Sequence, residues 1–515
     1  MKALSTGNIH KKGGSTLEIL IAFAILTLAL SATAMVIFGN QYAALAAQLN
    51  QEALYKAQGM LEEARATSRF DINLVVASTS TDTSGSLVYT KMLSVSQIDL
   101  YLKQVTSTVS WSQHGRVLSV SLSTILGDST NVQGGSTCSS VLTGNWNNPQ
   151  LGTPIAVGSS VDGNPVTGLT VFNKKIYITT SNTHGHNDDF YIYDTSVMPE
   201  SPTYLSSMDA NIVTPGLNAV AFASTTEGAF AYVANANTPN WSTCNAKASC
   251  AQVQVISVNN PSSLSVIKNI KIPATSTPFV TGSGGQGIGN TVTYKNGYLY
   301  IGLTKTQSGP EFVIYDVGAG AGSPTNPKYV GSYAVGRGVN TIVVARGFAY
   351  LATNDNVREV LVLDVHTPSS PVAVGLFNAP GSLGFGAGYS LSLIGNTLYL
   401  GRNYVSNAPE LFVLNVSTPA SVLPAIASVD VGISSDPQSI NGIVIRSTLA
   451  FLVTTDFLQI YNIANSVSPT LVHSLDVSSD GSVGAALACE GNYLYVGAYR
   501  SVNDKGVIYA VYPGV

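Results

Sequence analysis

The sequence predicts an α+β N-terminal part, made of a long N-terminal helix and a small antiparallel sheet, followed by an all-β propeller of about seven four-stranded blades. Two observations carry this prediction. A run of about twenty apolar residues near the N-terminus continues as an amphipathic pattern. Further along, one apolar-aromatic strand motif recurs seven times. A chain of 515 residues has room for both parts.

The first forty residues predict a membrane-spanning helix. Lys11-Lys12-Gly13-Gly14 is followed by a few polar residues and then by an apolar run, 19–38. As a helix this run is roughly 30 Å long, enough to span a bilayer core. The lysines place its N-terminal end in the cytoplasm. A secretory signal peptide has a shorter apolar region, with its cleavage site on the far side. Glu18 lies at the edge of the hydrocarbon and requires a partner.

This segment resembles the class III signal of type IV prepilins and pseudopilins, and the resemblance covers about a tenth of the chain. It implies that residues 1–13 are a leader that prepilin peptidase removes after Gly13, so that Gly14 is the first mature residue and Glu18 the fifth. It also implies that the new N-terminus is methylated. Glu18 would then pair with the amine of its own or a neighbouring subunit. Gly stands where the family commonly has Phe, which leaves open whether cleavage follows Gly13 or Gly14.

Beyond Phe38 the spacing of apolar residues predicts that the helix continues on an amphipathic pattern, so that residues 14–68 form one pilin-type helix. Residues 69–130 are expected to form a small sheet, with alternating segments at Leu87 to Met92, Val105 to Trp111 and Arg116 to Leu122. The stretch from Tyr89 to Leu126 resembles the end of a minor pilin related to the modification and assembly pilins.

Residues 131–148 are rich in Gly, Ser, Thr and Asn and are interpreted as a linker. In residues 149–515 the strand motif recurs at spacings of about 44 to 68 residues, in the sequences KIYITTS, AFAYVAN, YLYIGLT, FAYLATN, TLYLGRN, LAFLVTT and YLYVGAY. Such spacings are typical of four-stranded propeller blades. The last unit lacks its fourth strand, and Pro149 to Gly158 is predicted to supply it and close the ring.

The strand that follows each of these motifs has its own pattern, as in EFVIYDVG, EVLVLDVH and ELFVLNVS. Two or three β-branched or Leu residues precede Asp or Asn and then Val. This pattern resembles the LVIVD-repeat family of β-propellers. The resemblance rests on repetition over about 365 residues.

Composition narrows the class of protein. Charged residues make up 10% of the chain, against about 25% in an average soluble protein. Such a surface suits a protein outside the cytoplasm. The net charge is −4, and Lys and Arg do not cluster beyond the leader, so nucleic acid is not expected as a partner.

Two polar clusters are candidate metal sites, but an ordinary loop or turn without a metal is the favoured interpretation of both. His184, His186 and Asp188 offer metal ligands, although a solvated loop tip explains them better. Asp476, Ser478 and Asp480 before a Gly resemble the start of a calcium loop, but Leu487 replaces the twelfth-position Glu. Ca²⁺ is therefore a minor possibility beside an ordinary turn, and no other cofactor is expected.

The four cysteines suggest two pairs. Cys244 and Cys250 are close enough in sequence to form a disulfide within one loop, provided that the compartment is oxidising. Cys138 and Cys489 would come together if the strand before the first blade completes the last one. Both pairings, and the alternative of unpaired thiols, stay open at this point.

These features together predict a minor pilin that displays a propeller for adhesion or surface recognition, at the tip or another rare position of a type IV pilus-like filament. Its expected partners are other pilin subunits, prepilin peptidase, the membrane and a surface ligand, either protein or glycan. The protein would lie in the cytoplasmic membrane with a cytoplasmic N-terminus before assembly, and then in an extracellular filament or on the cell surface.

No GxSxG, HExxH or phosphate loop supports an enzyme. The alternatives are a pseudopilin that recruits cargo, a membrane-anchored propeller enzyme, and a structural initiator that caps the filament.

Overall fold

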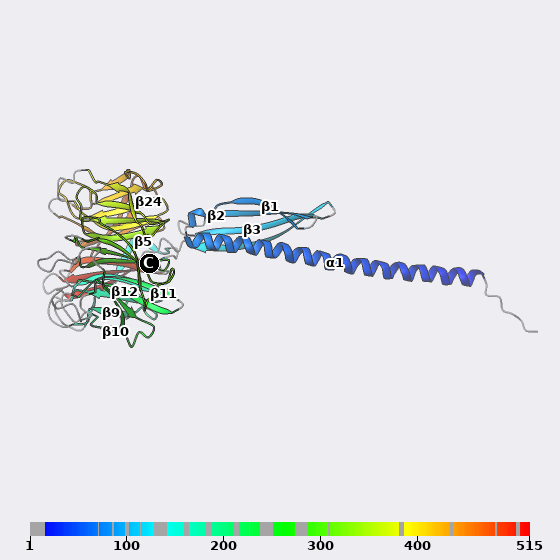
Figure 1. Ribbon diagram of the computed structural model, residues 1–515, viewed down its shortest axis with the longest axis horizontal. Coiled ribbons are helices and arrows are strands. Elements are labelled where there is room, and N and C mark those ends of the chain that lie inside the picture. The colour runs from blue at the N-terminus through cyan, green and yellow to red at the C-terminus, as the bar shows by residue number, and fades with distance from the viewer. Residues whose placement is uncertain are drawn as a thin grey trace, which may run out of the picture. The chain divides into compact units, whose positions relative to one another are not determined.

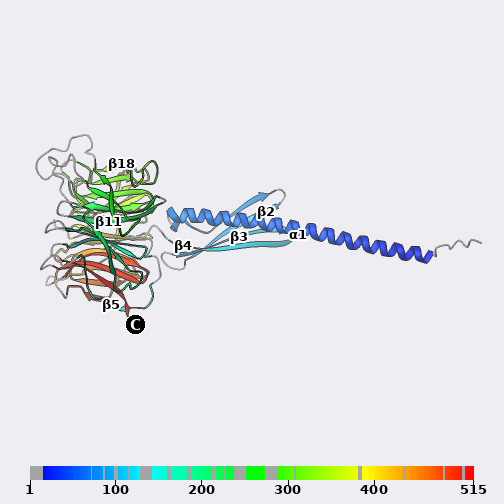
Figure 2. The ribbon, with the colours of Figure 1, turned by 90° about the horizontal axis from the view of Figure 1, so that it is seen from below.

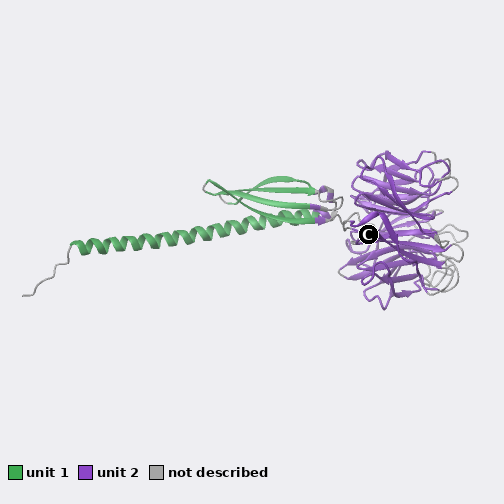
Figure 3. Cartoon of the chain, turned by 180° about the vertical axis from the view of Figure 1, so that it is seen from behind, with its two compact units in different colours: residues 1–66, 76–96, 104–125 green, residues 67–75, 97–103, 126–515 purple. Residues whose placement is uncertain are grey.

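The structure is a computed structural model that describes residues 16–70, 72–84, 87–97, 102–113, 115–127, 138, 142–158, 164–181, 187–210, 216–225, 227–236, 251–272, 287–306, 309–380, 386–432, 436–478, 482–500 and 505–514. The chain divides into two compact units (Figure 3). The first comprises residues 1–66, 76–96 and 104–125, and the second comprises residues 67–75, 97–103 and 126–515.

The N-terminal part is a long helix followed by a sheet (Figure 1). The helix α1 (Thr16–Phe70) has 55 residues and is followed by the short helix η1 (Ile72–Leu74). The sheet has the order β1-β2-β3-β4 and is antiparallel. Its strands are β1 (Ser78–Ser84), β2 (Leu87–Gln97), β3 (Leu102–Gln113) and β4 (Arg116–Gly127). The predicted helix is confirmed, and so are three of these strands, although each runs further than predicted. The sequence analysis missed β1.

The C-terminal half of α1 packs on one face of this sheet, and β2, β3 and β4 lie along the helix in Figure 2. The contact is built from the helix residues Leu49, Ala53 and Ala57 against large side chains of the sheet, which include Tyr89 and Trp111. The small alanines let the sheet approach the helix backbone closely, and the aromatic rings fill the space between them. This alternation of small and large side chains fixes which stretch of α1 faces the sheet.

The rest of the chain is a propeller whose blades are antiparallel four-stranded sheets. The first three blades are β7 (Val166–Phe172), β8 (Lys175–Thr180), β9 (Phe190–Asp194) and β10 (Thr203–Met208); β11 (Leu217–Thr225), β12 (Gly228–Asn235), β13 (Val253–Ser257) and β14 (Ser265–Ile270); and β15 (Gly289–Lys295), β16 (Tyr298–Leu303), β17 (Phe312–Asp316) and β18 (Lys328–Tyr333). The next three are β19 (Val339–Ala345), β20 (Phe348–Thr353), β21 (Val360–Asp364) and β22 (Val372–Phe377); β23 (Gly388–Ile394), β24 (Thr397–Arg402), β25 (Leu411–Asn415) and β26 (Ala425–Val429); and β27 (Ile440–Arg446), β28 (Leu449–Thr454), β29 (Phe457–Asn462) and β30 (Thr470–Asp476).

The seventh blade combines strands from the two ends of the propeller sequence. It contains β31 (Ser482–Glu490), β32 (Tyr493–Arg500), β33 (Lys505–Gly514) and, on the outside, β5 (Asn145–Leu151). The short strand β6 (Ile155–Ala156) pairs with another part of β33. The segment predicted to complete the last blade therefore does so. It begins at Asn145, however, which corrects the linker boundary at residue 148: Trp146 is buried in the last blade, 5.1 Å from the ring of Phe451.

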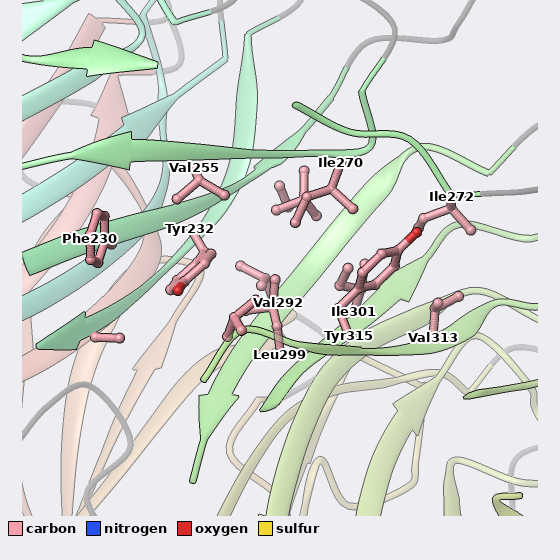
Figure 4. Close-up of a cluster of buried hydrophobic side chains, with 14 of the residues drawn as sticks. Phe230, Tyr232, Val255, Ile270, Ile272, Val292, Leu299, Ile301, Val313 and Tyr315 are labelled. Carbon is pink, nitrogen blue, oxygen red and sulfur yellow. The ribbon is translucent and has the colours of Figure 1, made fainter. Parts of the chain in front are cut away.

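Neighbouring blades pack through apolar faces. Figure 4 shows Tyr232 and Val255 of the second blade in the same cluster as Leu299 and Ile301 of the third. In the same way Val166 of the first blade shares a cluster with residues of the seventh. The middle strands are almost continuously apolar because each has a neighbouring blade on both faces. The outermost strands are more exposed, because only one of their edges is paired within the blade.

Candidate functional site

A cavity of about 950 Å³ lies at the centre of the propeller. The innermost strand of every blade lines it, namely β7, β11, β15, β19, β23, β27 and β31. It extends along these strands, since both Asn218 near the start of β11 and Ser224 near its end belong to the lining. Pockets of roughly this volume bind small molecules in many proteins. The cavity is therefore the candidate site, and its lining decides which chemistry it supports.

Each innermost strand has a β-bulge at the same place, where the pairing register with the second strand of its blade shifts by one residue. A bulge leaves one residue unpaired in the ladder and re-aims its side chain. All seven unpaired residues line the cavity. We call this set the bulge ring, and it consists of Thr167, Asn218, Asn290, Asn340, Tyr389, Asn441 and Ala485.

Most members of the bulge ring donate a hydrogen bond to the next blade. The Asn218 amide donates to the carbonyl of Gly289 at 2.8 Å, and the Asn290 amide donates to that of Val339 at 2.8 Å. Asn340, Asn441 and the Thr167 hydroxyl donate in the same way to Gly388, Gly484 and Leu217. Each acceptor directly precedes the next blade's own bulge residue. The amide planes are thus held in place. The Oδ1 atom of Asn340 also accepts a hydrogen bond from the Asn290 amide at 3.0 Å, whereas the bonds to the next blade do not use the Oδ1 atoms of Asn218, Asn290 and Asn441.

Two members of the ring depart from this pattern. In the fifth blade the neighbouring Ser390 hydroxyl donates to the carbonyl of Ile440 at 3.1 Å, so the structural bond does not use Tyr389. The Tyr389 side chain remains 38% exposed. In the seventh blade Ala485 has no donor. There the junction with the first blade is bridged elsewhere: Glu490 accepts hydrogen bonds from the Lys174 backbone and the Thr195 hydroxyl, both at 2.6 Å.

The cavity is polar but nearly uncharged. Among the described residues that line it there is no Asp, Glu, His, Cys or Arg, and Lys295, at the far end of β15 from the bulge ring, is the only charged side chain of this set. Tyr294 also lines the cavity, and burial raises the pKa of its hydroxyl, so the ring stays neutral. The described lining therefore offers mainly hydrogen bonds and apolar contacts to a ligand.

Buried acids do occur in the blades, in structural positions. Asp189, Glu311, Glu359 and Glu410 each directly precede the third strand of a blade and accept a backbone N–H from the segment that follows the fourth strand, at 2.8 to 3.0 Å. This bond fixes where each blade ends and the next begins. Burial raises the pKa of Glu410 to about 7.

Several residues singled out from the sequence lie outside the described residues: Gly13, Gly14, His184, His186, Cys244, Cys250 and Asp480. Of the others, Glu18 lies in the first turn of α1. An 18-residue window of α1 has a mean hydropathy of 2.5 and is not buried, which fits an N-terminal membrane anchor or signal sequence.

The two described members of the calcium-type cluster and Asp188 are engaged in local hydrogen bonds. Asp188 accepts a hydrogen bond from the Ser207 hydroxyl. Asp476 accepts from the backbone and hydroxyl of Ser478, at 2.7 and 2.8 Å, as in an ordinary Asx turn. Within the described part of the chain, no group of three or more His, Cys, Asp or Glu is placed to hold a metal ion.

Cys138 and Cys489 form a disulfide, with their Cα atoms 5.3 Å apart. It joins the segment before β5 to β31, so the chain that leads into the outermost strand of the seventh blade is also linked covalently to the innermost strand of that blade. This is the pairing that strand completion makes geometrically reasonable.

The bulge ring escaped the sequence analysis, although a signal for it exists. Asn recurs just before an apolar strand in GLNAVAF, IGNTVTY, GVNTIVV and INGIVI. The repeat that stands out in the sequence is that of the aromatic second strands. A bulge depends on the register between strands, which the spacing of apolar residues does not reveal.

Comparisons with known proteins leave the family open. No protein-family model matches the chain, and no curated protein matches it. Among solved structures, the AfRom2 CNH domain aligns over 70% of this chain and 98% of its own length, with 11% identity and a TM-score of 0.38. A similarity at this level supports no functional assignment.

Proposed function

We propose that the protein is a minor subunit of a type IV pilus-like filament, and that it displays the propeller for adhesion or surface recognition. The observation that carries the proposal is a change of surroundings along α1. From Leu49 onward the helix has a buried face against the sheet. Before that point large apolar side chains are exposed around the helix, among them Leu17, Phe23 and Phe38 at 63–67%.

The exposed half of α1 suits a bilayer or a bundle of apolar helices. Glu18 is the only acidic or basic residue between Thr16 and Gln51. The hydroxyls of Thr27 and Thr33 donate to backbone carbonyls one turn earlier, at 2.8 to 3.0 Å, so neither requires water. Exposed apolar area of this extent is unfavourable in water and marks a surface that another partner covers. A single carboxylate in it calls for a cationic partner.

The other half of α1 is fastened to its sheet by a polar cluster as well as by packing. Lys56 forms ion pairs with Asp82 at 2.7 Å and with Glu52 at 3.4 Å. The Tyr89 hydroxyl donates to Glu52 at 3.2 Å, and Lys56 lies 5.1 Å from the centre of the Tyr89 ring. Attachment of this kind supports a rigid head on a helix that inserts among other subunits. The second unit then supplies the recognition surface, with binding rather than catalysis proposed for its nearly uncharged cavity.

The test is intact-mass and N-terminal analysis of the membrane-extracted protein, produced with its own prepilin peptidase. We expect an N-methylated terminus at Gly14, and recovery of the protein in the sheared filament fraction. Glu18→Ala should be processed but lost from filaments, whereas Glu63→Ala, an exposed glutamate in the same helix, should assemble normally. An uncleaved Met1 terminus would overturn the proposal and reduce the protein to a membrane-anchored propeller.

A further inference from the structure

We infer that the central cavity binds an uncharged carbohydrate, held by the bulge ring. This inference narrows the recognition role and rests on the proposed function. Three properties of the described lining carry it: a single charged side chain, amides held in place by hydrogen bonds, and a tyrosine at a position where the bond to the next blade is made by its neighbour.

The charge of the lining selects a neutral ligand. A charged group that leaves water for a cavity needs an opposite charge or several strong hydrogen bonds. The buried acids of the blades, such as Glu311 and Glu359, accept hydrogen bonds from backbone N–H groups and are not among the residues that line the cavity. Lys295 is the one charged lining residue and lies at the other end of its strand from the bulge ring. Anionic and cationic ligands are therefore both poorly matched.

The amides of the ring suit hydroxyl groups. Each of four asparagines donates through Nδ2 to the next blade, and this bond orients the rest of the carboxamide before any ligand arrives. Preorganised polar groups lose little freedom on binding, which improves affinity. The Oδ1 acceptors of Asn218, Asn290 and Asn441 match the O–H donors that a sugar carries around its edge, while that of Asn340 accepts from the Asn290 amide. Apolar side chains further along the wall, including Val220, Ile342 and Ile443, match its C–H faces.

Tyr389 is the member of the ring that the fold does not require. It takes the bulge position where the second, third, fourth and sixth blades have Asn, and Ser390 makes the bond to the next blade instead. A second tyrosine, Tyr499, also lines the cavity and pairs with Val483, two residues before the seventh blade's bulge at Ala485. Exposed aromatic rings with a hydroxyl tip combine stacking area with a hydrogen bond, which is the combination that a sugar ring engages.

The experiment uses the full chain in a zwitterionic, non-glycosidic detergent, because a glycoside detergent would compete for the site. The protein is applied to arrayed neutral oligosaccharides and to their sulfated and carboxylated analogues. We expect binding to one or more neutral members and at least tenfold weaker binding to the charged analogue of each. Tyr389→Ala should weaken binding at least tenfold, and so should Ala485→Trp, which places a large ring in the lining of the cavity.

The matched control is Tyr329→Ala, since Tyr329 is 42% exposed on the outermost strand β18 of the third blade, away from the cavity lining. It should bind as the unaltered protein does, and thermal unfolding should be similar in all folded variants. No binding to any neutral oligosaccharide, or binding that survives both cavity variants, would overturn the inference, as would selective binding to charged glycans or to protein. Processing and filament recovery of Tyr389→Ala report separately on the proposed function, because this residue is remote in sequence from the leader and helix.

Discussion

The side-chain amide of Asn340 in the fourth blade donates a hydrogen bond of 2.7 Å to the backbone carbonyl of Gly388 in the fifth. Five bonds of this type, each from a bulge residue to the next blade, link successive blades around the cavity. A hydrogen bond at this position has two consequences: it stabilises the junction between blades, and it orients the amide that faces the cavity.

Asn340→Ala should therefore destabilise the propeller. The loss expected for this hydrogen bond, with the carbonyl of Gly388 left without this donor, is about 1–2 kcal/mol. The variant also removes the hydrogen bonds that the same carboxamide makes with Asn290 and Asn354, so the measured loss should be at least this large. The free energy of unfolding is measured by chemical denaturation of the full chain, monitored by a spectroscopic signal of the tertiary structure of the blades. Asn148→Ala is the control, because Asn148 is exposed on β5. Equal stability of the two variants would contradict a structural role for the bond.

Reduction of the Cys138–Cys489 disulfide should lower the stability of the seventh blade. Disulfides typically contribute about 2–4 kcal/mol to the free energy of unfolding. Thermal unfolding with and without reductant should show a lower midpoint for the unaltered protein, and no shift from this bond in Cys138→Ala/Cys489→Ala. Cys244→Ala/Cys250→Ala is the matched variant. It keeps only Cys138 and Cys489, so any effect of reductant on it comes from their disulfide. If reductant acts only through Cys244 and Cys250, the prediction is wrong.

Acid should loosen α1 from its sheet. The hydrogen bond and the charge of Lys56 hold the pKa of Asp82 below its ordinary value. Between the ordinary and the lowered value the unfolded state binds more protons than the folded state, so stability is present above this range and is lost as pH falls through it. Circular dichroism of α1 during thermal unfolding, from about pH 6 to pH 3, should show a steeper loss for the unaltered protein than for Asp82→Asn. The control Glu63→Gln should keep the steep dependence.

Glu410 should give the opposite pH dependence. Burial raises its pKa to about 7, above the ordinary value of 4.5, so the folded propeller binds the proton more tightly than the unfolded chain. Its contribution to stability is complete below the ordinary value and is lost as pH rises through the folded one. Glu410→Gln, which retains an acceptor for the Val431 amide, should flatten this dependence between about pH 5 and pH 8. The exposed Glu227→Gln should leave it unchanged.

The elements that the sequence predicts well are those whose pattern is local. The helix α1 and the second strands of the blades have a clear apolar period, so their residues could be placed without knowledge of their partners. β1 (STSTDTS) has no apolar alternation, because its side chains are mostly exposed. β5 (NWNNPQL) resembles a linker in composition and becomes a strand only because β33 presents an unpaired edge. The bulge ring could not be predicted for the same reason, because a bulge is defined only by the register between a strand and its neighbour.

The bond between Cys138 and Cys489 also sets how the propeller would respond to tension. A pull exerted along the chain from the N-terminal side reaches Cys138 before it reaches β5, and from there it passes through the disulfide into β31. The ladder between β5 and β33 then lies off the direct path of the force. In the oxidised protein, a pull should not peel β5 away before the innermost strand of the seventh blade itself resists; in the reduced protein, β5 would be the first strand to separate.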